Sequence, residues 1–422
     1  MFKERQCRPF PTLDAARRLR AGRELGRPKG DPMTRPTVVS VYVPLCSERC
    51  AFCDCLTIPS TLRDVVRYRE ALLAEIDAVA PDLEGQRVEA VRFDGGVPLL
   101  MGGAGVAEVL FRLRRRLQVA DDAEVTVETV PGKVDEHNLR LFAQIGVNRL
   151  EFGVATLVQA EHVRLRCPGV YGQIHEHDAL RRHLGPSDWG VELMYGLPGQ
   201  TLSTWEETVG KALALDPPHV SVDRMRRPAR AKDDQEEDGE ALAALRGHAV
   251  ARLREAGYAE YVVDRFAKPG CASRHVELTY AGADEVGLGA GARSLVGGYS
   301  YRNVDDVPTY LACSADPERV VKDVAVVDDV ARDLLAAARG VSCAAGFAPG
   351  RSTAEPQDGP ARATGAAGGA SRRAGALDAC LDSLVRHGWA HKDAAGAYRL
   401  TDEGAFHKDE AYRALGACLA GI

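Results

Sequence analysis

The stretch that decides the fold is Thr37-Val-Val-Ser-Val-Tyr-Val-Pro-Leu-Cys46-Ser-Glu-Arg-Cys50-Ala-Phe-Cys53-Asp-Cys55. Its first half is a β-branched run of the kind that forms a buried strand. Its second half places four of the eleven cysteines within ten residues, directly after that strand. In proteins built from βα units, the carboxyl ends of the strands carry the active site. The stretch therefore predicts a metal site at the end of the first strand of an α/β fold.

Outward from this stretch, short β-branched runs alternate with longer amphipathic stretches along the 422 residues. We expect parallel strands over Thr37–Val43, Val88–Phe93, Glu124–Thr129, Arg149–Val154, Gly190–Met194 and His219–Asp223. We expect the connecting helices over Leu62–Val79, Val106–Leu117, Glu136–Ile145, Gln173–His183 and Thr201–Ala214. Six such units predict an α/β fold that closes into a partial (β/α)6 barrel rather than the full eight-unit form.

The composition divides the chain into four segments. They are a basic leader broken by prolines at 1–36, a barrel core at 37–225, an extension of the core at 226–327, and a C-terminal domain at 328–422. A stretch rich in Ala, Gly, Pro, Ser and Arg at 344–373 predicts a flexible linker inside the last segment. The helices Asp328–Ala338 and Ala376–His387 and the strand Ala397–Leu400 indicate a small winged-helix-like α+β unit around it. We expect a packing or lid role for this unit, because it has no basic recognition helix for DNA.

Charge and hydrophobicity exclude several classes of partner. The 54 basic residues are outnumbered by 60 acidic ones and form no long single-sign block, which argues against a nucleic-acid partner. The chain has no apolar run long enough to cross a bilayer, and its polar start lacks the apolar stretch of a secretory signal. We therefore expect a cytoplasmic protein without a membrane partner. In a reducing compartment, clustered cysteines indicate metal ligation rather than disulfides.

The spacing of the first three clustered cysteines suits an iron–sulfur cluster. Thiolates of Cys46, Cys50 and Cys53 can hold three irons of an oxygen-sensitive [4Fe–4S] cubane and leave the fourth iron with an open position for chemistry. A structural zinc site is the alternative. Such a site normally needs a second ligand pair at a distance, and the remaining Cys and His show no paired spacing.

The string Cys46-x3-Cys50-x-Phe52-Cys53-x-Cys55 resembles the cysteine motif of the radical S-adenosylmethionine (SAM) superfamily. The fourth cysteine, Cys55, makes it similar to the oxygen-independent coproporphyrinogen dehydrogenase (HemN-like) branch. Ordered motifs extend the resemblance over about residues 38 to 310, with weaker likeness in the winged-helix tail. The resemblance implies a [4Fe–4S] cluster on Cys46, Cys50 and Cys53, SAM as cofactor, and Phe52 near its adenine. Cys55 is placed at the cofactor without being a cluster ligand.

Two further motifs resemble SAM contacts of this family. Asp94-Gly-Gly-Val-Pro98 stands where the family usually reads Gly-Gly-Gly-Thr-Pro, so Asp94, Gly95 and Gly96 are expected to receive the methionine ammonium of SAM. Glycines there would let backbone groups approach the ligand closely, although a plain strand-to-helix turn is the alternative. Glu128 begins the family's Glu-x-x-Pro and would bind SAM, whereas such a residue alone is more often a solvated charge at a strand end.

Three more segments follow in the family order. Gly146-Val-Asn-Arg-Leu-Glu-Phe-Gly-Val154 resembles a segment whose next residue is glutamine, but Ala155 stands here, so one SAM contact is lost or moved. Arg166 is expected to face the SAM carboxylate in a bidentate pair, with Arg164 as the alternative register. Glu192, in Glu192-Leu-Met-Tyr-Gly-Leu-Pro-Gly-Gln200, takes the place of the family's aspartate at the ribose hydroxyls.

The glycine run Gly287-Leu-Gly-Ala-Gly-Ala-Arg-Ser294 looks like a dinucleotide fingerprint, but no acidic residue stands at the required place after it. By the resemblance, this segment lies against a second SAM molecule, with Ala290 and Ala292 supplying backbone contacts. A plain tight turn is the competing interpretation.

The residues before the cluster bear on the reaction. Coproporphyrinogen enzymes of the family read Tyr-x-His-x-Pro-Phe-Cys there, with both polar residues in the site, whereas this chain reads Ser40-Val-Tyr42-Val-Pro-Leu-Cys46. The change argues against porphyrin propionate oxidation. The resemblance then implies a class C radical SAM methyltransferase that uses two SAM molecules.

Such an enzyme transfers a methyl or methylene group to an sp² carbon of an aromatic or heteroaromatic small molecule or carrier- or peptide-bound intermediate. An Ala-, Arg- and Gly-rich composition similar to that of high-GC actinobacterial proteins favours natural-product biosynthesis, such as an indolic acid or thiazole of a thiopeptide antibiotic. The proton acceptor would be Tyr42, Glu151 or His175. A flavodoxin- or ferredoxin-type electron donor is implied. The alternatives are a coproporphyrinogen III dehydrogenase, a heme-binding chaperone and a non-catalytic binding module.

Overall fold

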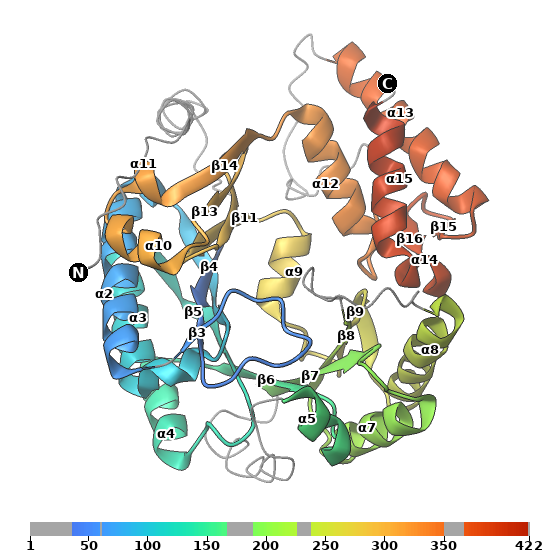
Figure 1. Cartoon of the computed structure of the whole chain (residues 1–422). Helices are drawn as coiled ribbons and strands as arrows, with labels where there is room; N and C mark the ends of the chain where they lie inside the picture. Colours follow the sequence, from blue (N-terminus) through green and yellow to red (C-terminus); the bar gives the residue numbers. More distant parts are fainter. Residues whose placement is uncertain (1–35, 60, 167–188, 226–237, 350–366, 421–422) are drawn as a thin grey trace. The chain divides into compact units, whose positions relative to one another are not determined.

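The computed structural model describes residues 36–59, 61–166, 189–225, 238–349 and 367–420 (Figure 1). The expected leader 1–36, apart from its last residue, and the expected helix Gln173–His183 lie outside the described residues. The chain forms two compact units. The first unit comprises Met1–Ser47, Cys55–Glu128 and Asp284–Val327, and the second comprises Glu48–Asp54, Thr129–Ala283 and Asp328–Ile422.

The sheet of the first unit is built around β1 (Thr37–Val43), whose four valines are almost completely buried. A strand buried on both faces is typical of the middle of a parallel sheet. β4 (Arg87–Gly95) pairs with β1 in parallel, and β5 (Gln118–Thr129) pairs with β4 in parallel. On its other edge, β1 pairs in parallel with β11 (Asp284–Leu288). An antiparallel meander extends the sheet through β12 (Arg293–Val296), β13 (Tyr299–Asn303) and β14 (Val321–Val326).

Helix α2 (Leu62–Val79) runs beside α3 (Gly102–Arg116) in the first unit (Figure 1). Thr61 caps α2 because its hydroxyl accepts the Asp64 amide, which satisfies one of the amides left open at a helix start. Tyr68, Leu72 and Ile76 form the buried face of α2 at helical spacing. The remaining elements are two 3₁₀ turns, two short strands and two short helices: Ala80–Leu83, Pro98–Met101, β2 (Leu45–Cys46), β3 (Ile58–Pro59), α10 (Val307–Cys313) and α11 (Pro317–Val320).

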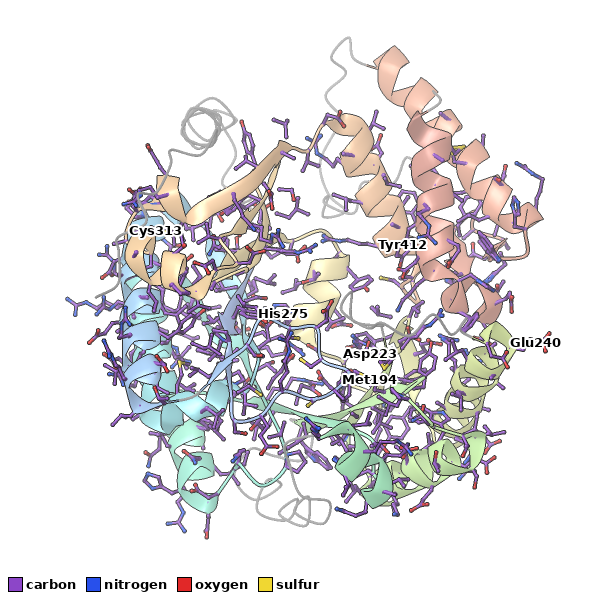
Figure 2. The ribbon with its side chains drawn as sticks, viewed as in Figure 1. Met194, Asp223, Glu240, His275, Cys313 and Tyr412 are labelled. Atoms are coloured by element: carbon purple, nitrogen blue, oxygen red, sulfur yellow. A yellow bond between two sulfur atoms is a disulfide. The ribbon has the colours of Figure 1, made fainter. Side chains whose placement is uncertain are left out.

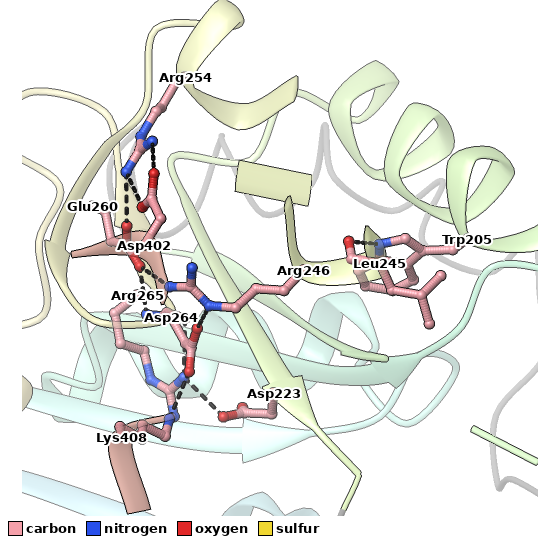
Figure 3. A network of polar contacts seen from close by, with 10 residues as sticks. All are labelled: Trp205, Asp223, Leu245, Arg246, Arg254, Glu260, Asp264, Arg265, Asp402 and Lys408. Carbon is pink, nitrogen blue, oxygen red and sulfur yellow. Dashed lines mark hydrogen bonds and ion pairs between the residues drawn. The ribbon is translucent and has the colours of Figure 1, made fainter. Parts of the chain in front are cut away.

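The second unit has a parallel core of β6 (Arg149–Ala155), β7 (Trp189–Tyr195) and β8 (His219–Arg224). An antiparallel pair, β10 (Arg265–Ala267) and β9 (Ala259–Val262), continues from β8. Its helices are α4 (Glu136–Ile145), α5 (Gln159–Leu165), α7 (Leu202–Ala214), α8 (Gly239–Glu255) and α9 (Arg274–Tyr280). The α7–α8 contact is fixed by the Trp205 indole N–H, which donates to the Leu245 carbonyl (2.7 Å; Figure 3).

The C-terminal part of the second unit has its own small core. Its elements are α12 (Asp329–Val341), α13 (Ala367–Arg386), β15 (Ala390–Lys392), β16 (Tyr398–Leu400), α14 (Asp402–Phe406) and α15 (Lys408–Ala420). Buried side chains from these helices and strands pack together, among them Val341, Leu381 and Leu415. A disulfide between Cys380 and Cys418 links α13 to α15. The sequence did not predict this bond, because two cysteines 38 residues apart carry no spacing signal.

The structure differs from the sequence predictions in two places. Helix α13 begins at Ala367, inside the stretch 344–373 that was expected to be a linker. Before it, Phe347 forms a β-bridge with Tyr398. The meander β11 to β14 lies in the predicted core extension, where no strand was expected. Across the described ranges, no helix combines the length and apolar character needed to span a membrane.

A network of charged side chains joins α8 to the start of α14 and α15 within the second unit (Figure 3). Arg246 is almost fully buried and donates to Asp264 (2.9 Å) and to Glu260 (2.7 Å). Lys408, the first residue of α15, reaches the other oxygen of Asp264 at 2.5 Å. Near the surface, Arg254 pairs with Asp402 at 2.8 Å. Because buried carboxylates are stable only when their charge is compensated, this network ties the C-terminal helices to α8 and β9.

We predict that Arg246→Met destabilises the protein by roughly 3 to 5 kcal/mol, because it leaves the buried Asp264 and the half-buried Glu260 without their shared cation. Arg252→Met is the matched control, since Arg252 lies on the same helix in an exposed pair with Glu255. That change should cost no more than about 0.5 kcal/mol. Denaturant unfolding of the two variants measures the difference. Equal stabilities would show that the buried network contributes little.

We also predict that the double variant Cys380→Ser/Cys418→Ser loses roughly 2 to 4 kcal/mol of unfolding free energy, because the disulfide restricts the unfolded chain. Reducing agent should shift the wild-type unfolding curve by the same amount and leave the double variant unchanged. Cys271→Ser serves as the control. Alkylation of Cys380 and Cys418 in unreduced native protein, detected by mass spectrometry, would contradict the disulfide.

Candidate metal and cofactor site

The cysteine loop runs as irregular backbone from β2 to β3. Cys46, Cys50 and Cys53 are half-buried and Cys55 is exposed, while a turn closes where the Cys53 amide donates to the Cys50 carbonyl (3.1 Å). Among the described residues, no three His, Cys, Asp or Glu side chains stand in an arrangement that would hold a metal ion. The donor set nevertheless fits iron by its chemistry. Soft sulfur donors at this spacing suit an iron–sulfur cluster, and the backbone between them is not fixed by a helix or a strand.

The backbone that leads into Cys46 rests on the glycine motif of β4. The Gly96 amide donates to the Val43 carbonyl (2.8 Å), and the next amide, that of Val97, donates to the Leu45 carbonyl (2.7 Å). A β-carbon at position 96 would lie only 2.4 Å from the Leu45 carbonyl oxygen. Gly96 is therefore required by the packing of the chain on itself, whatever it does toward a ligand.

Tyr42 contacts both the cysteine loop and the glycine motif. Its hydroxyl donates to the Leu56 carbonyl (3.0 Å), on the limb of the loop that follows Cys55. Its ring lies against Gly95, where a β-carbon would come within 2.9 Å of the ring and where φ is +106°. Asp94 is half-buried and lies opposite Tyr42 in the β1–β4 register. Tyr42, which the sequence offered as a proton acceptor, thus has a bracing contact in this structure.

Glu128 is not a lone solvated charge. It lies half-buried near the end of β5, and the Arg92 guanidinium on β4 donates to its Oε1 through Nε at 2.8 Å. The β4–β5 register pairs Phe93 with Val127. The next residues along the two parallel strands are Asp94 and Glu128. The Arg92 contact holds the Glu128 carboxyl group in place near the glycine motif.

The middle of the cysteine loop belongs to the second unit and lies at the end of α5. The Ala51 amide donates to the Leu165 carbonyl (2.8 Å). Phe52 packs with Met194 against a small apolar cluster of Leu165, Leu197 and Met225. An apolar surface of this kind suits the flat face of an adenine ring. The predicted place of Phe52 near the adenine stays a prediction.

Glu192 lies half-buried on β7, in register with Gly153 on β6 and Ser221 on β8. Two residues on, Met194 pairs with Asp223, and both side chains are labelled in Figure 2. Asp223 accepts a bond from Arg265 at 2.9 Å. Burial lowers the pKa of the Arg265 guanidinium, but Asp223 and then Glu192 raise it, and the net result is a pKa above the usual value. Glu192 therefore lies within electrostatic reach of the Arg265 guanidinium.

The two candidate arginines take different positions. Arg166 is exposed and ends α5 in the left-handed conformation (φ +51°). Arg164 lies beside Gly199, where a β-carbon would be 3.1 Å from its Cζ, and it is 3.8 Å from Glu161. Gly199 belongs to the turn that follows Glu192 on β7, so the structure brings Arg164 to that motif. The choice of Arg166 stays a prediction.

Backbone polar groups of the glycine run after β11 form hydrogen bonds with other residues of the chain. The Ala290 amide donates to the Tyr68 hydroxyl (2.9 Å), the Ala292 amide to the Gly289 carbonyl (3.2 Å), and the Ala292 carbonyl accepts from the Asn303 amide (2.8 Å). Both alanines are buried. The backbone contacts that the sequence assigned to a second SAM are therefore already made within the chain.

Of the two remaining candidates for a proton acceptor, the structure describes only Glu151. Glu151 is buried at the amino end of β6, paired with Arg149 (2.7 Å) and His219 (3.3 Å). Met194, which packs against the same apolar cluster as Phe52, is near the opposite end of the neighbouring strand β7. His175 lies outside the described residues.

Sequence reasoning missed Tyr68 and Glu75, which hold the glycine run from α2. The signal was present, because Glu75 falls at helical spacing on the apolar face of that helix. Burial raises the pKa of Glu75 to about 7, against the lowering effect of hydrogen bonds from Tyr310, Gly289 and Asn303. An acidic residue on an apolar helix face indicates a buried polar network.

The chain is similar to several known proteins. A family model described as the radical SAM superfamily matches residues 40–212. "Heme chaperone HemW" of Escherichia coli K12 is 30% identical over 284 residues, which cover 62% of this chain and 70% of the relative. HemW of Synechocystis is 28% identical over 283 residues, covering 62% and 67%. The "oxygen-independent coproporphyrinogen III oxidase" of Pseudomonas aeruginosa is 29% identical over 329 residues, covering 72% and 68%.

Among solved structures, coproporphyrinogen III oxidase (HemN) of Escherichia coli aligns with a TM-score of 0.75 and 19% identity, over 94% of this chain and 93% of that one. The match confirms the predicted α/β radical SAM fold with a partial barrel. It places the chain beside HemN in fold alone. The sheet differs from the prediction, because the antiparallel pairing of β11 to β14 makes it mixed rather than parallel.

The comparisons correct the predicted reaction. The relatives carry the names of heme chaperones and of a coproporphyrinogen oxidase, so the predictions of a class C methyltransferase and of thiopeptide biosynthesis are wrong. The use of two SAM molecules has no support outside those predictions. The superfamily implies a [4Fe–4S] cluster and SAM. The chain belongs to the radical SAM superfamily, in the branch that contains HemW and HemN.

Proposed function

We propose that this chain is a heme-binding radical SAM protein of the HemW type. The observation that carries the proposal is the 30% identity to HemW of Escherichia coli over 284 residues. The polar residues before the cluster point the same way. Ser40 and Tyr42 stand where coproporphyrinogen enzymes of the family carry tyrosine and histidine, which removes two side chains that those enzymes use in the site.

We propose that Cys46, Cys50 and Cys53 hold the [4Fe–4S] cluster. When bound, a cluster of this kind supplies an open iron position at which SAM is held and reductively cleaved. The chain's own residues shape the surroundings. Tyr42 fixes the returning limb of the loop through Leu56. In the second unit, Phe52 and Met194 present an apolar surface that would keep water from an adenine ring.

An oxygen-independent coproporphyrinogen III oxidase is the second candidate. It is favoured by the 29% identity to the Pseudomonas aeruginosa oxidase over 72% of the chain. Cys55 supports the same candidate, because the fourth cysteine resembles the coproporphyrinogen branch. Heme binding and porphyrinogen oxidation leave different products, so one set of anaerobic assays separates the two.

We predict that Cys50→Ser abolishes the cluster, while Cys55→Ser retains it, because Cys55 is the one cysteine of the group outside the proposed ligand set. Anaerobic reconstitution with iron and sulfide, followed by the visible absorption of the cluster and iron analysis, measures the difference. Retention of a full cluster in Cys50→Ser would contradict the ligand assignment. Loss of the cluster in Cys55→Ser would show that Cys55 belongs to the set.

We predict that the reconstituted protein binds added heme with a stable Soret band and does not decarboxylate coproporphyrinogen III in the presence of dithionite and SAM. Heme titration by absorption and mass analysis of the porphyrin fraction are the two measurements. Myoglobin is the positive control for the heme titration, and a heme-free, denatured sample of the same chain is the negative control. Conversion of coproporphyrinogen III without stable heme binding would overturn the HemW-type proposal in favour of the oxidase.

A further inference from the structure

We infer that Glu75 and Tyr68, on the buried face of α2, are positioning residues for the cysteine loop. The inference rests on the proposed cluster, since it assigns a role toward the loop that would hold it. All contacts that carry it lie within the first unit. These contacts lead from Glu75 to the glycine run after β11, then to Tyr42, and finally to both limbs of the loop.

Glu75 holds Gly289 directly at its backbone N–H and, through Asn303, at its carbonyl. The carboxylate is 1% exposed, and its Oε2 accepts the Gly289 amide (2.8 Å) and the Tyr310 hydroxyl (2.6 Å). Its Oε1 accepts the side-chain amide of Asn303 (2.6 Å), which also donates to the Gly289 carbonyl (2.9 Å). A buried carboxylate that is fully bonded to fixed donors makes a rigid support, because breaking any bond leaves a buried polar group unsatisfied.

The glycine run, held by Glu75, lies in close contact with the end of β1. Gly289 has φ +103°, and a β-carbon there would lie 2.4 Å from the Tyr42 carbonyl oxygen. The Tyr68 hydroxyl bridges the two segments. It donates to that same Tyr42 carbonyl (2.9 Å) and accepts the Ala290 amide (2.9 Å). One hydroxyl group therefore sets the distance between the glycine run and the strand that enters the cysteine loop.

Both limbs of the loop rest on this arrangement. Tyr42 precedes Cys46 by four residues on the entering limb, and its own hydroxyl donates to Leu56, the residue directly after Cys55 on the returning limb. A β-carbon at Gly291 would lie 3.6 Å from the Leu56 side chain, so the glycine run also passes next to the returning limb. The glycine run thus acts as the surface on which the two limbs are held together.

A purely structural network would contribute to stability and nothing more. A structural role and a positioning role of Tyr68 can be separated at its hydroxyl group. Tyr68→Phe removes the hydroxyl that bridges Tyr42 and Ala290 and keeps the ring that fills the core. Tyr258→Phe is a matched control. Tyr258 is also buried, and its hydroxyl also donates to a backbone carbonyl, that of Pro217, but it belongs to the second unit, whereas the contacts of Tyr68 lie in the first.

The test compares wild type, Tyr68→Phe, Tyr310→Phe and Tyr258→Phe as full-length chains. In metal-free protein, hydrogen exchange of peptides that contain Ala290 should speed up in Tyr68→Phe by roughly fivefold or more and stay unchanged in Tyr258→Phe. After reconstitution, the EPR spectrum of the reduced cluster, with and without SAM, should change in Tyr68→Phe. A smaller change in the same direction is expected for Tyr310→Phe, which removes one of the three donors to Glu75.

The outcomes separate this inference from the proposed function. A wild-type chain that forms no SAM-responsive cluster defeats the proposed function and this inference with it. A wild-type cluster with the spectrum and SAM response unchanged in Tyr68→Phe defeats the positioning role alone, as does an equal spectral change in Tyr258→Phe. Altered spectra in Tyr68→Phe and Tyr310→Phe, with Tyr258→Phe like wild type at equal iron content, support it.

Discussion

Close contact between backbones at the end of β1 is the constraint on which the first unit depends. The strand from Tyr42 to Cys46 is touched on one side by Gly96 and on the other by Gly289, each at a distance that only glycine permits. Hydrogen bonds from the Gly96 and Val97 amides fix the strand's path into the loop. A side chain at either glycine would displace the backbone that carries the first cysteine. The glycine motifs are thus explained first by the packing of the chain on itself, and any contact to a ligand is added to that.

Local signals predicted much of the fold. The bounds of β1, α2 and α4 were predicted to the residue, because the buried strand, the Thr61 cap and the left-handed Gly146 are each determined by a few neighbouring residues. The meander β11 to β14 was missed, since its strands are short and their pairing depends on partners distant in the chain. The disulfide between Cys380 and Cys418 was missed for the same reason.

The candidate site was predicted unevenly. The cysteine spacing and the order of the motifs identified the superfamily, because they are fixed by the cofactor chemistry. The reaction was predicted wrongly. The altered residues Ser40 and Tyr42 argue against one activity, but the absence of a side chain does not specify what replaces it, and the relatives point to heme rather than to methyl transfer. Glu75 and Tyr68 act through contacts with residues more than 200 positions away, which no local pattern reports.

We propose above all that the loop from Cys46 to Cys53 holds a [4Fe–4S] cluster with one iron open to SAM. Mössbauer spectroscopy of protein reconstituted anaerobically with ⁵⁷Fe, before and after addition of SAM, tests it most directly. We expect cubane iron in which a single site changes its isomer shift when SAM is added, while the other sites keep theirs. A spectrum in which SAM alters no site, or protein that takes up zinc in place of the cluster, would contradict the account.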